Sequence, residues 1–293
     1  MLSNGVNLLR GTVNMIDLHN HILFGIDDGP KVIEESVQMC RIGYQDGIRT
    51  IVATPHIQPG IYQNNRSTIL TKLQQLNNAL MKFGVQSSEF VVKNSPFTHV
   101  QNVFNDPNVP NDLNDSNRLK ILPGADVHFS SDVLQRYEEG EIVTVNDQGR
   151  YLMVEFAFQG IPYQAEEVLF KLLTKGITPI ISHPERNMEI AQRPKRYYEM
   201  IRMGCLGQVT AMSLTGDFGS GVRRIAEKLL SKRLIHMIAS DAHSADGRPP
   251  ILSAAVKAAE KIVGKEEAQK MVTEYPQAVI DGRRPNIPEP IKL

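Results

Sequence analysis

The strongest constraint on the fold is the regular alternation of short apolar runs with amphipathic segments along the 293-residue chain. This alternation is typical of βα units arranged around a parallel sheet. It predicts strands at Asn14–Leu18, Thr50–Thr54, Lys120–Pro123, Tyr151–Phe156, Thr178–Ser182, Cys205–Val209 and Leu234–Ser240. Seven strands separated by helices indicate an incomplete, TIM-like barrel. A doubly wound open sheet is the competing topology, since the number of strands does not separate the two.

The helices predicted between these strands end at glycine in several places, as expected where a helix C-terminus needs a positive φ. They are Val32–Asp46, Ser67–Phe83, Gln164–Lys175, Pro194–Met203, Gly221–Ser231, Ile251–Val263 and Glu266–Thr273. Residues 1–14 are predicted to be an N-terminal extension, and residues 15–293 a single domain. Residues 94–118 contain seven Asn, three Asp and three Pro, which favours an irregular surface insertion.

Composition excludes several classes of partner and chemistry. Lys+Arg and Asp+Glu balance at 32 each, so neither a nucleic-acid partner nor an anionic membrane surface is expected. The two cysteines, Cys40 and Cys205, lack a nearby partner, which argues against a disulfide framework and a thiolate zinc site. With no long apolar run, membrane insertion is not expected. The sequence therefore predicts a cytoplasmic protein.

Imidazole and carboxylate side chains gather where the predicted strands end. His19 and His21 share one face of the first strand, because side chains two apart in an extended segment point the same way. The later strands deliver His56, Asp126, Glu155, His183, Asp241 and His243. Since the C-terminal ends of parallel strands converge on one mouth, these residues are predicted to meet in a single site.

Each of these features alone has an ordinary structural explanation. An HxH pair can simply be hydrogen-bonded at a strand end, and Asp241 with His243 can cap the next segment. Glu155 within an apolar strand is costly to bury unless it pairs with an arginine or binds a metal. Their occurrence together at successive strand ends favours a metal centre. Imidazole and carboxylate ligands without thiolate suit Mn, Fe or Zn, and so many ligands predict two or three ions that activate a bridging water.

Several motifs in order resemble the PHP superfamily, and more narrowly its bacterial metal-dependent tyrosine-protein phosphatase branch of the CpsB/YwqE type. The motifs are MIDLHNHILFGIDDGPK, ATPH, Gly124-Ala125-Asp126, VEF, SHPER and ASDAHSADGRPP. The resemblance spans roughly residues 15–281 outside the insertion. It implies a distorted (β/α)7 barrel of the PHP type with a trinuclear metal site. From the ligand chemistry, manganese is the metal expected there.

Carried over to this sequence, the resemblance implies three ligand sets. They are His19, His21, Asp126 and Asp241; then Asp126, Glu155 and His183; and finally Asp28, His56 and His243. Arg186 and Arg248 match the arginines that surround the phosphate, with forked donors suited to its oxygens. Relatives carry Gly-Ala-Glu where this chain has Gly124-Ala125-Asp126. We expect Gly124 to let the strand end move inward, so that the shorter Asp126 still bridges two ions.

The resemblance implies hydrolysis of phosphotyrosine on proteins, with a bacterial tyrosine kinase of polysaccharide export as partner, and a role in capsular or exopolysaccharide synthesis. A PHP-type phosphatase for a small metabolite such as histidinol phosphate is an alternative, as is a non-catalytic, metal-containing regulator of a kinase. A thiol-based phosphatase needs Cys-x5-Arg, but Asp46 and Ala211 occupy the arginine positions. The glycine-rich segment 216–221 lacks the lysine and spacing of a P-loop and is predicted to be a flexible loop.

Overall fold

The structure is a computed structural model that describes residues 14–82 and 118–293. The predicted insertion at 94–118 and the predicted extension at 1–14 therefore lie, but for one residue each, outside the described residues. Every strand in the described ranges runs parallel to its neighbours. The strands are β1 (Met15–Asn20), β2 (Ile48–Ala53), β3 (His56–Ile57), β4 (Lys120–Pro123), β5 (Asp126–His128), β6 (Tyr151–Glu155), β7 (Thr178–Ser182), β8 (Leu206–Thr210) and β9 (Met237–Ala239).

The strands form one closed barrel, although two of them are interrupted. β1, β2 and β4 pair in one sheet, and β3, β5, β6, β7, β8 and β9 pair in order in another. β3 continues β2 after a two-residue break, and β5 continues β4 in the same way. The barrel closes where the ends of β1 and β9 meet, because the N–H of Asp241 donates to the carbonyl of His19 at 2.8 Å and that of His21 to the carbonyl of Ala242 at 2.9 Å.

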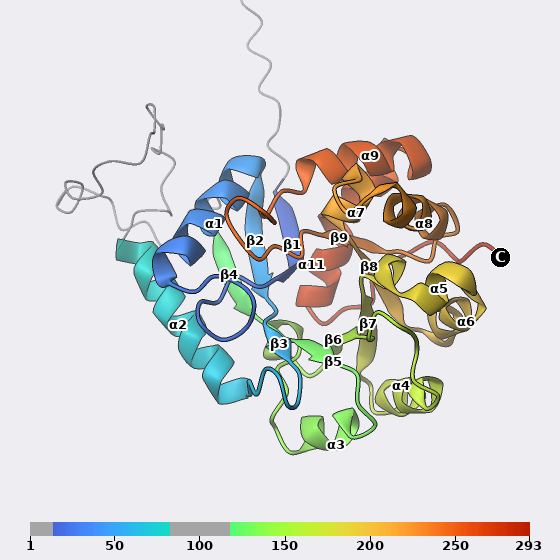
Figure 1. The fold of residues 1–293 in the computed structure, drawn as a ribbon, viewed down its shortest axis with the longest axis horizontal. Helices are drawn as coiled ribbons and strands as arrows, with labels where there is room; N and C mark the ends of the chain where they lie inside the picture. The colour runs from blue at the N-terminus through green and yellow to red at the C-terminus, as the bar shows by residue number, and fades with distance from the viewer. Residues whose placement is uncertain (1–13, 83–117) are drawn as a thin grey trace, which may run out of the picture.

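With the interrupted strands counted once, the barrel formed by the described residues has seven strands, as predicted, and the alternative of an open doubly wound sheet is wrong. Helices surround the strands in Figure 1. They are α1 (Ile33–Asp46), α2 (Arg66–Lys82), α3 (Val133–Glu138), α4 (Ala165–Thr174), α5 (Met188–Gln192), α6 (Lys195–Met203), α7 (Ala211–Thr215), α8 (Ser220–Ser231), α9 (Ser253–Val263), α10 (Lys265–Lys270) and α11 (Glu274–Ile280), with single 3-10 turns η1 (Val145–Asp147) and η2 (Pro184–Arg186).

Most predicted elements lie within one or two residues of their observed bounds. The prediction for the last strand was too long, since only Met237–Ala239 pairs, and α10 ends three residues before the predicted Thr273. The strands β3 and β5 and the short helices α3, α5, α7 and α11 were not predicted from the sequence. These elements are seven residues or fewer, too short for hydrophobic periodicity to identify them.

Most strand residues are buried on both sides, as a barrel inside a ring of helices requires. All residues of β1, β6 and β8 are buried. At the N-terminal ends of the strands, the C-terminal segment covers the barrel: the N–H of Ile16 donates to the carbonyl of Val272, and the Tyr151 hydroxyl donates to that of Arg283. The opposite end, where the strands finish, is left to the polar side chains of the site.

Candidate metal centre

The residues predicted as ligands from seven parts of the chain all lie together at the C-terminal ends of the strands. Of these, Asp28 lies in the loop after β1 and is the most exposed, with 46% of its side chain accessible. The others are buried or nearly so: His19, His21, His56, Asp126, Glu155, His183, Asp241 and His243. Four overlapping groups within this set have ligand atoms close enough to share an ion.

The first group is formed by His19, His21 and Asp241. The Nε2 atoms of the two histidines lie 3.6 and 3.5 Å from Asp241 Oδ1, and Asp126 Oδ2 is 3.6 Å from His19 Nε2. Asp241 has a φ of +52°, in the left-handed region that few residues other than glycine adopt. This backbone conformation is uncommon, and it turns a carboxylate toward the imidazoles.

Asp126 is the most central of the carboxylates. Its Oδ2 faces His19, His56 and His183 at 3.6, 3.7 and 3.9 Å, while its Oδ1 accepts a hydrogen bond from Ser182 Oγ at 2.6 Å. His183 Nε2 also lies 3.4 Å from Glu155 Oε1. The buried atoms Asp126 Oδ2 and His56 Nδ1 have no hydrogen-bond partner among the residues that the structure describes. Unpaired buried polar atoms that face one another are what a cation-binding site without its cation presents, so these residues fit a metal.

The backbone at Gly124, two residues before Asp126, is packed too tightly to admit a side chain. A Cβ at Gly124 would lie 2.7 Å from Val52 Cγ1 and 3.2 Å from the carbonyl oxygen of Ala53. Glycine therefore allows this strand to approach β2 closely. The expected inward movement of the strand end at Gly124 stays a prediction. Whether Asp126 bridges two ions stays a prediction.

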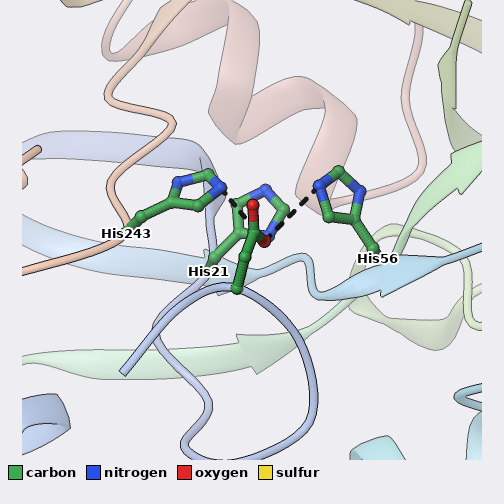
Figure 2. A group of neighbouring side chains, drawn as sticks. His21, His56 and His243 are labelled. Carbon is green, nitrogen blue, oxygen red and sulfur yellow. Dashed lines mark ion pairs between the residues drawn. The ribbon is translucent and has the colours of Figure 1, made fainter. Parts of the chain in front are cut away.

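Another of the four groups combines His21, Asp28, His56 and His243. Figure 2 shows the three imidazoles converging from different parts of the chain. Asp28 Oδ1 lies between His243 Nε2 at 3.4 Å and His56 Nε2 at 3.7 Å. Because the other ring nitrogen of His56 faces Asp126, this histidine borders two of the groups. The predicted set of Asp28, His56 and His243 is thus brought together.

Hydrogen bonds hold several imidazoles with Nε2 directed into the site. His19 Nδ1 lies 3.0 Å from Gln208 Oε1, and His21 Nδ1 lies 2.8 Å from Asp27 Oδ2. His243 Nδ1 is 2.9 Å from the carbonyl oxygen of Asp241. An Nδ1–H that donates to an oxygen leaves the Nε2 lone pair free, which is the usual arrangement of histidine ligands.

Three supporting residues were not predicted from the sequence: Asp27, Gln208 and His128. His128 Nδ1 lies 3.3 Å from Glu155 Oε2. A signal for one of them was present, since Gln208 is a polar residue within a predicted buried strand. His128 shares a face with Asp126 on β5, a strand that the sequence does not predict. Asp27 adjoins Asp28, and the sequence does not distinguish which carboxylate supports a histidine and which faces the site.

Burial and neighbouring charges set the protonation of the site. Burial lowers the pKa of His183 to about 3, assisted by Arg186, so its imidazole is neutral at pH 7. Burial also raises the pKa of Asp126, and the nearby Glu155 carboxylate raises it further. For Asp241 burial acts against ionisation, but His19 and Arg248 outweigh it and lower the pKa. Neutral imidazoles and crowded carboxylates together suit divalent cations.

Both arginines predicted to bind phosphate lie beside the cluster. Arg186 Nη1 donates to Asp241 Oδ2 at 2.7 Å, and Arg248 Nη2 donates to the same oxygen at 2.6 Å. They are 19% and 26% exposed, so their guanidinium groups line the site rather than the outer surface. Asp241 thus faces two imidazoles with one oxygen and two guanidinium groups with the other.

Comparison with known proteins agrees with this arrangement. The family model for capsular polysaccharide synthesis, CpsB/CapC, matches residues 15–94 and 93–281. The chain belongs to this family. Within it, the chain is 32% identical over 282 residues to the tyrosine-protein phosphatase YwqE of Bacillus subtilis, covering 95% of this chain and 97% of the relative. It is 31% identical over 271 residues to the tyrosine-protein phosphatase CpsB of Streptococcus pneumoniae, covering 91% and 98%.

The family also accounts for the fold. A crystal structure from work on YwqE of Bacillus subtilis and CpsB of Streptococcus pneumoniae, described there as unique metal-dependent tyrosine phosphatases, aligns with a TM-score of 0.81 and 30% identity. The alignment covers 95% of this chain and 99% of that chain. The predicted resemblance and the predicted barrel are therefore confirmed.

Proposed function

We propose that this protein is a metal-dependent phosphatase that hydrolyses phosphotyrosine on proteins. The observation that carries the proposal is the position of Arg186 and Arg248 at the edge of the buried His/Asp/Glu cluster. Guanidinium donors beside a cation site suit a phosphate monoester, whose oxygens can bind both. Relatives that match nearly the whole chain are named tyrosine-protein phosphatases.

Different residues of the site have different proposed roles: metal binding, phosphate binding and orientation of the histidine ligands. We propose that two or three divalent ions, manganese in the first place, bind the predicted ligand sets, with Asp126 shared between two of them. Bound there, such ions supply Lewis acidity that activates water and neutralises the departing phenolate. Arg186 and Arg248 hold the phosphate oxygens, and Gln208 and Asp27 keep His19 and His21 oriented.

Thiol chemistry has no place in this site. Cys40 and Cys205 are buried, and burial raises the pKa of the Cys205 thiol to about 12. A thiol with so high a pKa is not ionised at neutral pH and is a weak nucleophile. The exclusion made from the Cys-x5-Arg spacing thus agrees with the structure.

We further propose a tyrosine kinase of bacterial polysaccharide export as the phosphoprotein partner, and the cytoplasm as the place of action. The family model's description, capsular polysaccharide synthesis, supports this partner. Across residues 14–82 and 118–293, no helix is both long and apolar enough to cross a bilayer.

One experiment separates the proposal from its alternatives. The purified protein would be analysed for metals and then assayed on a phosphotyrosine peptide and on histidinol phosphate, before and after chelation. We expect the peptide to be the better substrate, with activity lost on chelation. Preference for histidinol phosphate would favour the small-metabolite phosphatase. A metal-loaded protein inactive on both substrates would favour the non-catalytic regulator.

A further inference from the structure

Three aromatic side chains from three different loops border the metal and phosphate site. Tyr62 follows β3, Phe158 follows β6, and Phe218 lies in the glycine-rich segment between α7 and α8. We call these three residues the aromatic rim. Each is partly exposed, and each ring contacts a residue already placed in the site.

Two members of the rim have a local structural role. The Tyr62 ring is nearly parallel to that of His56, with centroids 5.5 Å apart and an interplanar angle of 11°. The ring centroid of Phe218 lies 5.0 Å from the guanidinium carbon of Arg186 and 5.6 Å from the guanidinium carbon of Arg248. Cation–π contacts at such distances help to fix the direction of a guanidinium group.

Phe158 is different, because much of its ring remains open to solvent. Its side chain is 44% exposed, although it stands beside a polar site. The ring centroid lies 4.9 Å from the guanidinium carbon of Arg186 and 6.1 Å from the ring of His183. Phe158 therefore presents an accessible apolar surface next to the proposed phosphate-binding residue Arg186 and the proposed metal ligand His183.

We propose that Phe158 contacts the aryl ring of the substrate and so sets the preference for aryl over alkyl phosphate monoesters. This inference rests on the proposed function. A guanidinium group has five N–H donors, of which Arg186 uses one on Asp241, so others can reach phosphate oxygens. A phosphate held there places its ester group near Phe158. A phenyl group gains an aromatic contact in that position, whereas the single methylene of phosphoserine does not.

The test measures binding to the metal-loaded protein by titration calorimetry, with phenylphosphonate and methylphosphonate as ligands. These probes share the phosphonate and differ in the ring, and neither is hydrolysed. We expect Phe158→Ala to weaken phenylphosphonate binding about tenfold and methylphosphonate binding less than twofold. Phe158→Tyr, which keeps the ring, should bind both as the wild type does. Phe170→Ala, an exposed phenylalanine on α4, is the matched control and should change neither.

Other outcomes overturn the inference in distinct ways. Equal weakening of both ligands would mean that Phe158 merely positions Arg186. Equal affinity of the wild type for both ligands, or unchanged binding by Phe158→Ala, would remove Phe158 from substrate recognition. Because none of these measurements needs turnover, failure of the inference is distinguishable from failure of the proposed function, which would appear as a metal-loaded protein inactive on phosphotyrosine.

Discussion

Removing the Arg186 side chain is the most informative perturbation of the proposed phosphate site. The guanidinium group is 19% exposed and donates to Asp241 Oδ2 at 2.7 Å. A charge-assisted hydrogen bond to a substrate phosphate in such a position is worth roughly 1.5–3 kcal/mol. Arg186→Ala should therefore lower kcat/KM on a phosphotyrosine peptide by about tenfold to a hundredfold. Arg186→Lys should lose less kcat/KM than Arg186→Ala, since lysine restores the positive charge but not the forked N–H donors of the guanidinium group.

Metal should not be lost from the protein by the same change. Asp241 Oδ2 keeps the hydrogen bond from Arg248 Nη2 at 2.6 Å and that from Thr210 Oγ1 at 3.3 Å, so the carboxylate stays in place. Arg196→Ala is a suitable control, because Arg196 pairs with Glu166 and Glu189 outside the site. Steady-state kinetics and elemental analysis would be run on all variants. Wild-type kcat/KM in Arg186→Ala, or a loss explained wholly by missing metal, would refute the assignment.

Further predictions concern metals, the central carboxylate, the second arginine and acid stability. Chelation should abolish phosphatase activity and Mn²⁺ should restore it better than Mg²⁺, whereas thiol alkylation, which tests for a catalytic cysteine, should leave it intact. Asp126→Ala should lose at least one ion per chain and nearly all turnover, and Asp126→Glu should retain part; full metal content in the alanine variant would contradict this. Arg248→Ala should lower kcat/KM as Arg186→Ala does, and lost solubility alone would instead indicate a structural role. Burial lowers the pKa of His236 from 6.5 to about 4. As the pH falls, His236 is therefore protonated in the unfolded chain before it is protonated in the folded protein. The free energy of unfolding falls as the pH drops from 6.5 toward 4, and this group accounts for about 2 kcal/mol of the loss at pH 5. Chemical denaturation at pH 7 and pH 5 would measure the free energy of unfolding of the wild type and of His236→Gln. The loss between the two pH values should be about 2 kcal/mol smaller in the variant. An equal loss in both proteins would contradict the assignment.

The sequence predicted the parts of the site that depend on strand ends. His19 and His21 share a face by the two-residue period of a strand, and Asp126, Glu155 and Asp241 come where apolar runs finish. Because parallel strands end at one mouth of a barrel, these residues had to converge. The fold class followed from the same alternation, although closure itself depends on the contact between the ends of β1 and β9.

Features that depend on three-dimensional detail could not be predicted in this way. The breaks at Thr54-Pro55 and at Gly124-Ala125 divide two strands between the sheets, and no periodicity marks so short a continuation. The aromatic rim was missed because Phe158 and Phe218 lie in loops whose course the sequence does not fix. The sharing of one Asp241 oxygen by two arginines was likewise unforeseen, since Arg186 lies in a 3-10 turn and Arg248 in a loop, beyond the strand ends that the sequence locates.

Asp241 has a consequence for the thermodynamics of the whole site. One carboxylate oxygen faces imidazole ligands and the other accepts from two guanidinium groups. A cation bound at the first oxygen would draw charge toward it and so weaken the hydrogen bonds that the second oxygen accepts from the arginines, which would become more available to phosphate. Such linkage is reciprocal, so an oxyanion that engages the arginines must raise the affinity for the cation by the same factor. Occupancy by ions and occupancy by phosphate are therefore expected to rise together, with one side chain as the coupling element.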